Sequence, residues 1–318
     1  MRPSPPAGPV PMTAPTTPRA PSSPAACYAD AAAYRTATIV RHAQIADNTW
    51  RLRIECPEIA VAAVPGQFAM LRIPRRHDPL LARPLAVYDT FRHADDGNAP
   101  ASAGQPARYV DFIYAVHGRF TTALRELSAG QDIVIWGPLG NGFDVPAVDH
   151  LVLVAGGIGQ TALLALGRER SGLTTYGPAS RPAPARAGRV TVCWGARHAG
   201  LFGGIEDFRA AGFEVHQATL DGSAGLRGTV IDLLDARCGG SPEGMRVACC
   251  GPDPMMAAVA RWTAARAIPC DVSLEAPMAC GVGICFTCVA RIRDADGGWD
   301  YRRTCVEGPV FDAARVEW

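Results

Sequence analysis

Four cysteines near the C-terminus have a spacing that suits one kind of inorganic cluster. Three of them fall in "MACGVGICFTC" and the fourth in "YRRTCVEGPVF", which gives the series Cys280-x4-Cys285-x2-Cys288-x16-Cys305. A C-x4-C-x2-C run with a distant fourth cysteine is the spacing of plant-type [2Fe–2S] proteins, in which thiolates hold two sulfide-bridged irons. The sequence therefore predicts a [2Fe–2S] cluster held by these four cysteines.

The residues between the first two cysteines fit the same purpose. Gly281 and Gly283 permit positive φ angles, so the loop can turn its backbone amides toward the cluster sulfurs. Structural zinc is the alternative, but zinc sites usually combine two close pairs of Cys or His. The other cysteines are predicted to be small buried hydrophobic residues. They are Cys27, Cys56, Cys193, Cys238, Cys249, Cys250 and Cys270.

Two further motifs could hold a dinucleotide. "LVLVAGGIGQTALLAL" runs from a buried strand through a glycine turn into a helix, and Gly156, Gly157 and Gly159 would let a pyrophosphate approach the helix start. Such turns also occur for purely structural reasons. "CCGPDPMM" places a Cys-Gly-Pro at 250–252, at the carboxyl end of another strand, where parallel sheets bind ligands. The second motif strengthens the first.

A third motif, "LLARPLAVYD", contains an arginine followed by a proline. Proline holds the residue before it in an extended conformation, which leaves the Arg83 guanidinium able to pair with a phosphate. An isolated Arg-Pro usually marks the end of a surface strand. This motif therefore indicates a phosphate site only in combination with the other motifs.

The elements that would position these motifs change character along the chain. Residues 34–146 contain short alternating strands and predict an antiparallel barrel. Residues 147–268 alternate strands and helices, which predicts a parallel sheet with crossover helices. Residues 269–318 carry the cysteines and form a small third domain, whereas residues 1–33 are rich in Pro and Ala and predict a disordered tail. The fold class is thus α/β plus a β-barrel.

Composition narrows the function classes. The chain has 318 residues and a net charge of +1, so nothing indicates a nucleic-acid partner or an anionic membrane surface. No apolar run approaches the roughly 18 residues of a membrane span. The 11 cysteines are odd in number and follow no secretory signal, which disfavours a secreted disulfide framework and predicts a cytoplasmic location.

The order of these parts resembles the ferredoxin–NADP reductase superfamily. Within it, the chain resembles the electron-transfer subunits of NAD-linked, class 1B dihydroorotate dehydrogenase, from about residue 34 to the C-terminus. The most specific likeness is "MACGVGICFTC" followed by "TCVEGPVF". The resemblance implies a flavin-binding barrel, a nicotinamide-binding domain and a cluster domain. It also implies three cofactors, namely FAD, a [2Fe–2S] cluster and NAD.

The resemblance also implies a set of flavin contacts, with three departures from the family pattern. Ala86 replaces the serine of the family's R-P-L-S motif, Ala115 stands where relatives tend to carry arginine, and Phe120 replaces the glycine of a Gly-Thr pair. Ala86 lacks a hydroxyl contact to the flavin, and Phe120 cannot copy the backbone freedom of glycine, although Thr121 can still bond to a phosphate. The implied FAD-binding residues are Arg83, Pro84, Leu85, Ala86, Ile113, Tyr114, Ala115, Phe120 and Thr121.

The nicotinamide contacts implied by the resemblance match the family more closely. Only Ala162 differs, because relatives often have proline there. NAD is implied in preference to NADP, and no arginine cluster is evidently placed for a 2′-phosphate. No catalytic acid or base is predicted, because an electron relay requires none. The implied residues are Gly156, Gly157, Gly159, Asp221, Cys250, Gly251 and Pro252.

As a function, the resemblance implies electron transfer from an FMN-bearing catalytic subunit that oxidises dihydroorotate in pyrimidine (UMP) biosynthesis. Electrons would pass through the [2Fe–2S] cluster and FAD to NAD⁺, in an assembly of two subunits of each kind. The partner would dock near Phe286, Val289 and Tyr301, unless these residues pack the core of the small domain. One alternative is a subunit of an NAD(P)H:ferredoxin or sulfide dehydrogenase-type flavoprotein. Another is a non-enzymatic iron–sulfur or zinc protein.

Overall fold

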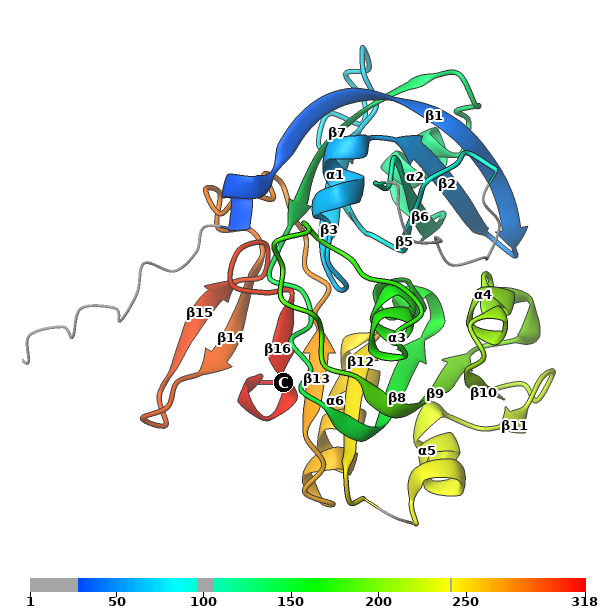
Figure 1. Ribbon diagram of the computed structural model, residues 1–318, viewed down its shortest axis with the longest axis vertical. Coiled ribbons are helices and arrows are strands. Elements are labelled where there is room, and N and C mark those ends of the chain that lie inside the picture. Colours follow the sequence, from blue (N-terminus) through cyan, green and yellow to red (C-terminus); the bar gives the residue numbers. More distant parts are fainter. Residues whose placement is uncertain (1–27, 96–105, 241) are drawn as a thin grey trace, which may run out of the picture.

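The computed structural model describes residues 28–95, 106–240 and 242–318 (Figure 1). These residues form two seven-stranded sheets and one two-stranded hairpin. Residues 1–27 of the predicted disordered tail lie outside the described part. The described chain starts with the 3-10 helix η1 (Tyr28–Ala31), which leads directly into the first strand.

The first sheet is antiparallel and curls into a half-barrel, which confirms the predicted barrel. Its order is β4-β3-β7-β1-β2-β6-β5. Immediately after β4, the Tyr88 amide donates to the Asp111 carbonyl of β6 at 2.9 Å, so the two ends of the sheet approach each other. The strands are β1 (Ala33–Ala46), β2 (Thr49–Glu55), β3 (Phe68–Arg72), β4 (Arg83–Ala86), β5 (Asp89–Phe91), β6 (Tyr109–Ala115) and β7 (Asp132–Leu139).

Apolar side chains on alternate strand positions fill this half-barrel, and two short helices close it. The core includes Ile39, Leu52, Phe112 and Ile135, which are fully buried. The helices are α1 (Pro57–Ala62) and α2 (Gly118–Leu124), and α2 contributes the buried Leu124 to the same core. Alternation of period two thus places one apolar face of these strands inside the half-barrel.

The second sheet has the order β11-β10-β9-β8-β12-β13-β16, and only β16 runs antiparallel. This confirms the predicted parallel sheet. Its strands are β8 (Val148–Gly156), β9 (Ala187–Ala196), β10 (Glu214–Thr219), β11 (Leu226–Arg227), β12 (Met245–Cys250), β13 (Cys270–Ser273) and β16 (Val310–Asp312). The helical elements are η2 (Gly157–Ala162), α3 (Leu164–Arg170), η3 (Ala199–Leu201), α4 (Ile205–Ala210), α5 (Val230–Cys238) and α6 (Asp253–Ala264).

Helices cover both faces of this sheet, which explains the continuous apolar run of β8. Val152 and Val154 pack in one core with α5 and α6, whereas Leu151 and Leu153 pack in the other with α3 and α4. A strand buried on both faces needs apolar residues at every position. Across the described ranges, no helix combines the length and apolar character needed to cross a bilayer.

The C-terminal segment leaves the second sheet and returns to it. After β13 it forms the cysteine loop and the hairpin β14 (Val289–Arg293) and β15 (Trp299–Arg303). It then rejoins the sheet as β16 and ends in the 3-10 helix η4 (Ala313–Arg315). The hairpin projects from the side of the molecule opposite β11 (Figure 1).

Candidate cofactor sites

The four cysteines of the C-terminal segment lie in two pairs of contacting thiols. Cys280 contacts Cys285, and Cys288 contacts Cys305. Among the described residues, no group of three or more His, Cys, Asp or Glu side chains is arranged to hold a metal ion. A [2Fe–2S] cluster contains two irons with two thiolates each, so a pairwise arrangement is the one it requires.

The backbone of the loop has the conformation that its glycines predict. Gly281 has φ 74° and Gly283 has φ 82°, both in the left-handed region. The Val282 amide donates to the Cys280 sulfur at 3.4 Å. Amide donors of this kind stabilise the negative charge of a thiolate or cluster, so the loop fits a thiolate-held cluster.

The two thiol pairs differ in exposure and in ease of ionisation. Cys285 is exposed, and contact with the Thr287 hydroxyl at 3.1 Å helps to lower its pKa to about 6. Cys305 is buried, and burial raises its pKa to about 12. Since cluster ligands must be deprotonated, the Cys285 thiol gives up its proton more readily than the Cys305 thiol when a cluster is loaded.

The cysteine loop packs against the barrel. A Cβ atom at Gly281 would lie 2.6 Å from Met70 Cγ on β3 and 3.0 Å from Leu139 Cδ1 on β7. The Trp136 indole N–H, also on β7, donates to the Cys280 carbonyl at 3.1 Å. Glycine at 281 is therefore required by close approach as well as by its φ angle.

The same apolar contact reaches the strand that carries the predicted flavin motif. Ala82, the residue before β4, belongs to one buried cluster with Cys288 and Cys305. Arg83 begins β4 and its side chain is exposed, with its guanidinium donating to the Ala82 carbonyl at 2.9 Å. The cysteine loop and the R-P-L motif are thus neighbours in space, although about 200 residues separate them in the chain.

The predicted flavin residues of β6 point in alternating directions. Ile113 packs with the residues of the second sheet, on the outside of the half-barrel. Tyr114 points inward, where its hydroxyl bonds to the His42 Nε2 atom at 2.9 Å. The Tyr114 side chain is therefore engaged in the barrel core, which leaves its backbone for contact with a cofactor.

The turn before α2 departs from the predicted arrangement. The positive φ of this turn belongs to Gly118, at 76°, and not to position 120. Phe120 is buried in the barrel core. The Thr121 hydroxyl donates to the His117 carbonyl at 2.7 Å and accepts from its amide at 2.6 Å. Sequence reasoning missed Gly118, although a glycine three residues before a threonine at a helix start was a visible signal.

The glycine turn and the Cys-Gly-Pro motif meet at one edge of the second sheet. Strands β8 and β12 are adjacent, with Ala155 opposite Cys250. A Cβ atom at Gly159 would lie 2.2 Å from the Cys250 carbonyl oxygen, and one at Gly156 would lie 2.9 Å from Pro252 Cδ. These contacts leave no room for a side chain, so the turn presents bare backbone at the carboxyl ends of the strands.

Two other predicted residues of this region, Asp221 and Cys250, have shifted pKa values. Asp221 follows β10 at the same edge of the sheet, and hydrogen bonds from the Ser223 hydroxyl (2.6 Å) and amide (2.9 Å) lower its pKa. Cys250 is buried, which raises the pKa of its thiol well above the usual range. The site therefore offers one carboxylate and one neutral thiol.

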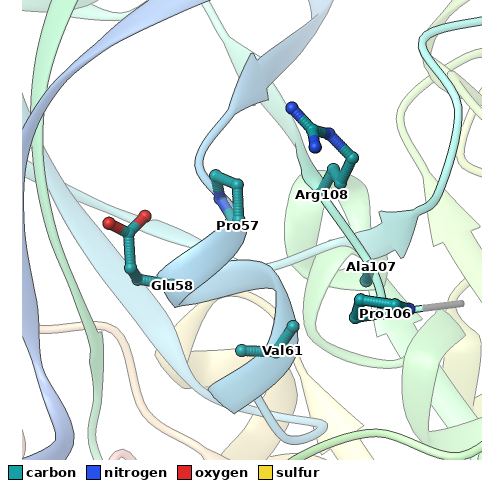
Figure 2. Close-up of a pocket in the computed structure, with 6 residues that line it drawn as sticks. All are labelled: Pro57, Glu58, Val61, Pro106, Ala107 and Arg108. Carbon is teal, nitrogen blue, oxygen red and sulfur yellow. The ribbon is translucent and has the colours of Figure 1, made fainter.

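A separate cavity lies away from these motifs. Figure 2 shows it between α1 and the segment that leads into β6, with a volume of about 370 Å³. Its charged residues are engaged with neighbours, since Glu58 pairs with Arg35 and Arg108 pairs with Glu55. The lining residues are Pro57, Glu58, Val61, Pro106, Ala107 and Arg108, none of which was predicted to bind a cofactor.

Known proteins with similar sequences identify the family. The model of the iron–sulfur cluster binding domain of dihydroorotate dehydrogenase B matches residues 275–317. The dihydroorotate dehydrogenase B (NAD(+)) electron transfer subunit of Desulforamulus reducens is 34% identical over 86% of this chain and 94% of its own length. This chain belongs to that family. The corresponding subunit of Bacillus caldolyticus has the same identity and coverage.

Solved structures with a similar fold include a ferredoxin-NADP oxidoreductase and a ferredoxin reductase. An NADH-dependent reduced ferredoxin-NADP oxidoreductase, studied for flavin-based electron bifurcation, is 26% identical with a TM-score of 0.68, covering 89% of this chain and 90% of that one. The ferredoxin reductase of carbazole 1,9a-dioxygenase, at 19% identity and TM-score 0.57, covers 75% of this chain and 67% of its own and shows the fold alone.

Membership of the dihydroorotate dehydrogenase B family confirms several predictions. The predicted family, the fold class, and the set of FAD, [2Fe–2S] cluster and NAD are confirmed, as is the assignment to an oxidoreductase. The main functional prediction is supported over the ferredoxin or sulfide dehydrogenase alternative. An electron transfer subunit also implies a separate catalytic subunit as its partner.

Proposed function

We propose that this chain carries electrons from a dihydroorotate-oxidising catalytic subunit to NAD⁺ in pyrimidine biosynthesis, in the cytoplasm. The observation that carries the proposal is the order of the sites in space. The cysteine loop packs on the barrel beside β4, and β4 is in contact with β6. Strand β6 in turn lies against the glycine turn η2 of the second sheet. A path from cluster to flavin to nicotinamide therefore needs no large movement of the chain.

Each part of the chain has a distinct task in this relay. When bound, the cluster supplies one-electron transfer, and the flavin joins single electrons to a hydride. Cys280, Cys285, Cys288 and Cys305 hold the cluster. The barrel, residues 34–146, holds FAD, and residues 147–268 hold NAD. Residues 269–318 carry the cluster and also add β13 and β16 to the second sheet.

Named backbone and side-chain groups bind the two nucleotides. Strand β4 presents the Arg83 guanidinium at the surface, where it can pair with a flavin phosphate. Other FAD contacts come from Pro84, Leu85, Ala86, Ile113 and Ala115, and from the backbone of Tyr114, Phe120 and Thr121. The NAD contacts come from Gly156, Gly157, Gly159, Asp221, Cys250, Gly251 and Pro252, since the bare turn admits a pyrophosphate and the Asp221 carboxylate suits a ribose hydroxyl.

The catalytic subunit docks on exposed apolar residues beside the cysteine loop, in an assembly of two plus two. Ile284 is 77% exposed, Phe286 60% and Tyr301 53%, so these side chains do not pack the core of the segment. Val289 is half-buried. The Arg303 guanidinium lies 5.1 Å from the Phe286 ring centre. Exposed aromatic and aliphatic residues beside an arginine are typical of a protein interface.

Cofactor content is the first test of this proposal. The anaerobically purified chain is expected to contain about two irons and two sulfides, with about one FAD. The Cys288→Ser variant should lose the iron, because one of the four cluster ligands is removed, and keep the flavin, because no residue assigned to FAD is changed. A colourless protein that contains zinc would overturn the electron-transfer function.

Docking is tested separately by binding of the purified catalytic subunit. We expect Phe286→Ala to raise the dissociation constant for the catalytic subunit by about tenfold or more, as for a central interface residue. Leu226→Ala is the matched control, because Leu226 is 38% exposed on β11 at the opposite side of the molecule (Figure 1). Equal affinities for both variants and the parent chain would exclude this docking surface.

A further inference from the structure

Buried charged side chains join the barrel to the second sheet, and of the motifs above only "LLARPLAVYD" contributes to these contacts, through Tyr88 and Asp89. Arg51 on β2 bonds to Asp111 on β6 at 2.6 Å and crosses to Asp207 on α4 at 3.0 Å. The Tyr88 hydroxyl, also from the barrel, donates to the same Asp207 oxygen at 2.6 Å. The Asp207 side chain is only 4% exposed. These contacts form the first bridge between the two sheets.

A second bridge lies directly beside the first. Asp89 on β5 forms an ion pair with Arg168 on α3 and accepts a hydrogen bond of 2.6 Å from the Tyr176 hydroxyl. The Asp89 and Arg168 side chains are 2% and 3% exposed. Asp89 stands opposite Asp111 in the β5–β6 ladder, so the two bridges lie side by side. We call them together the network.

Both bridges attach to the elements that surround the glycine turn. Helix α3, which carries Arg168, begins two residues after η2 ends. Helix α4, which carries Asp207, follows Gly203, whose carbonyl accepts a bond of 3.2 Å from the Gln160 side chain of η2. The network therefore holds the turn from two sides, through its own helix and through the neighbouring one.

A network of this kind specifies an orientation. Charges buried away from water are tolerated only when their partners and geometry are good, so a small rotation of one sheet against the other would be costly. Interfaces between domains of one chain otherwise permit relative motion by default. We propose that Asp207 and Asp89 are positioning residues that fix the nicotinamide-binding sheet in one orientation over the flavin-binding strands. This inference rests on the proposed function.

The network matters for only one half of the relay. Hydride transfer needs donor and acceptor atoms aligned closely, and misplacement by about 1 Å can reduce a rate by about 100-fold. The cysteine loop contacts the barrel at β3, β7 and Ala82, the residue before β4, and none of these contacts involves a residue of the network. Loosening the network should therefore slow hydride transfer between the flavin and NAD, and leave electron transfer from the catalytic subunit unchanged.

The test uses the holoenzyme with its cofactors and catalytic subunit. For Asp207→Asn we expect kcat for NADH oxidation with a dye acceptor to fall about 10- to 100-fold. The dissociation constant for NAD⁺ and the rate of flavin reduction by dihydroorotate should stay within about twofold of the parent. Glu206→Gln is the matched control on the same helix, because Glu206 pairs with Arg209 at the exposed surface.

A second readout does not depend on activity. Hydrogen exchange of backbone amides in β5, α3 and α4 should accelerate in Asp207→Asn, with the amides of β8 and β12 unchanged. Unchanged exchange and unchanged kcat would overturn the proposal. If Asp207→Asn fails to fold, the Tyr88→Phe variant is tested instead. It removes one hydroxyl from the network and should lower kcat about threefold or more. An unaffected kcat in a folded Tyr88→Phe enzyme would equally overturn it.

The proposed function and this inference can fail separately. If the parent enzyme oxidises NADH with a dye but accepts no electrons from dihydroorotate, the proposed partner is wrong and the positioning network still stands. If dihydroorotate reduces the flavin normally and Asp207→Asn leaves both kcat and backbone hydrogen exchange unchanged, only the positioning role of the network is wrong.

Discussion

The half-barrel has two interfaces with the rest of the chain, and they are built from different chemistry. Toward the cysteine loop, the described contacts are apolar packing around Met70 and neutral hydrogen bonds such as that from Trp136 to the Cys280 carbonyl. Toward the second sheet, apolar packing is joined by the buried charges around Asp89 and Asp207. Both interfaces are well packed, but only one is ionic.

The difference matches what each interface has to transmit. Apolar packing is non-directional, so it keeps two parts close without fixing their rotation. Single-electron transfer depends mainly on closeness. Buried ion pairs are directional and lose their stabilisation when geometry changes, which suits a step that depends on alignment. The chain thus uses the costlier interaction where orientation counts.

The largest expected effect is on the ionic interface. Arg168→Met leaves the buried Asp89 carboxylate without its guanidinium, and we expect the free energy of unfolding to fall by about 3–5 kcal/mol. Denaturant unfolding of the FAD-loaded chain measures it. Arg209→Met, which breaks an exposed pair with Glu206, should cost about 0.5 kcal/mol or less. Similar losses for both variants would show that the buried network has no special role.

The apolar interface is tested by a pair of glycine substitutions. Gly281→Ala places a methyl group 2.6 Å from Met70 Cγ, so we expect overpacking to cost about 1–3 kcal/mol beyond backbone strain. Gly297→Ala has a similar positive φ but meets nothing within 4 Å, and should cost only the strain of about 1–2 kcal/mol. Iron content and unfolding free energy are the measurements. Equal effects would mean that the loop does not press on the barrel.

A smaller effect is expected from the neutral hydrogen bond at that interface. Trp136→Phe keeps an aromatic ring near Tyr34, whose ring centre is 5.8 Å away, but removes the donor to the Cys280 carbonyl. We expect a loss of about 1 kcal/mol and faster release of iron to a chelator. A release rate equal to that of the parent protein would show that packing alone holds the loop.

The smallest effect is expected at the hairpin, away from both interfaces. The Arg291 guanidinium lies 3.9 Å from the centre of the Trp299 ring, and Trp299 is 45% exposed. Arg291→Met should therefore change the unfolding free energy by about 0.5–1 kcal/mol. A loss comparable to that of Arg168→Met would contradict the contrast between buried and exposed cations.

Much of the site could be predicted because its signals are local. The cysteine spacing, the glycines of the cluster loop and the "VAGGIG" turn each act within a few residues, where chain geometry alone limits what they can do. The alternation in the barrel strands and the continuous apolar run of β8 likewise depend on near neighbours. These patterns determined the family, the sheet types and the cluster ligands that we propose.

Only the tertiary structure decided how distant parts meet. Arg51 pairs with Asp111 across 60 residues and with Asp207 across 156, and no local pattern selects those carboxylates from the others. The packing of Gly281 on Met70, and the inward turn of Phe120, also depend on which surfaces dock. The physical reason is that periodicity and loop geometry are properties of a short segment. Burial and charge pairing exist only once two segments have been brought together.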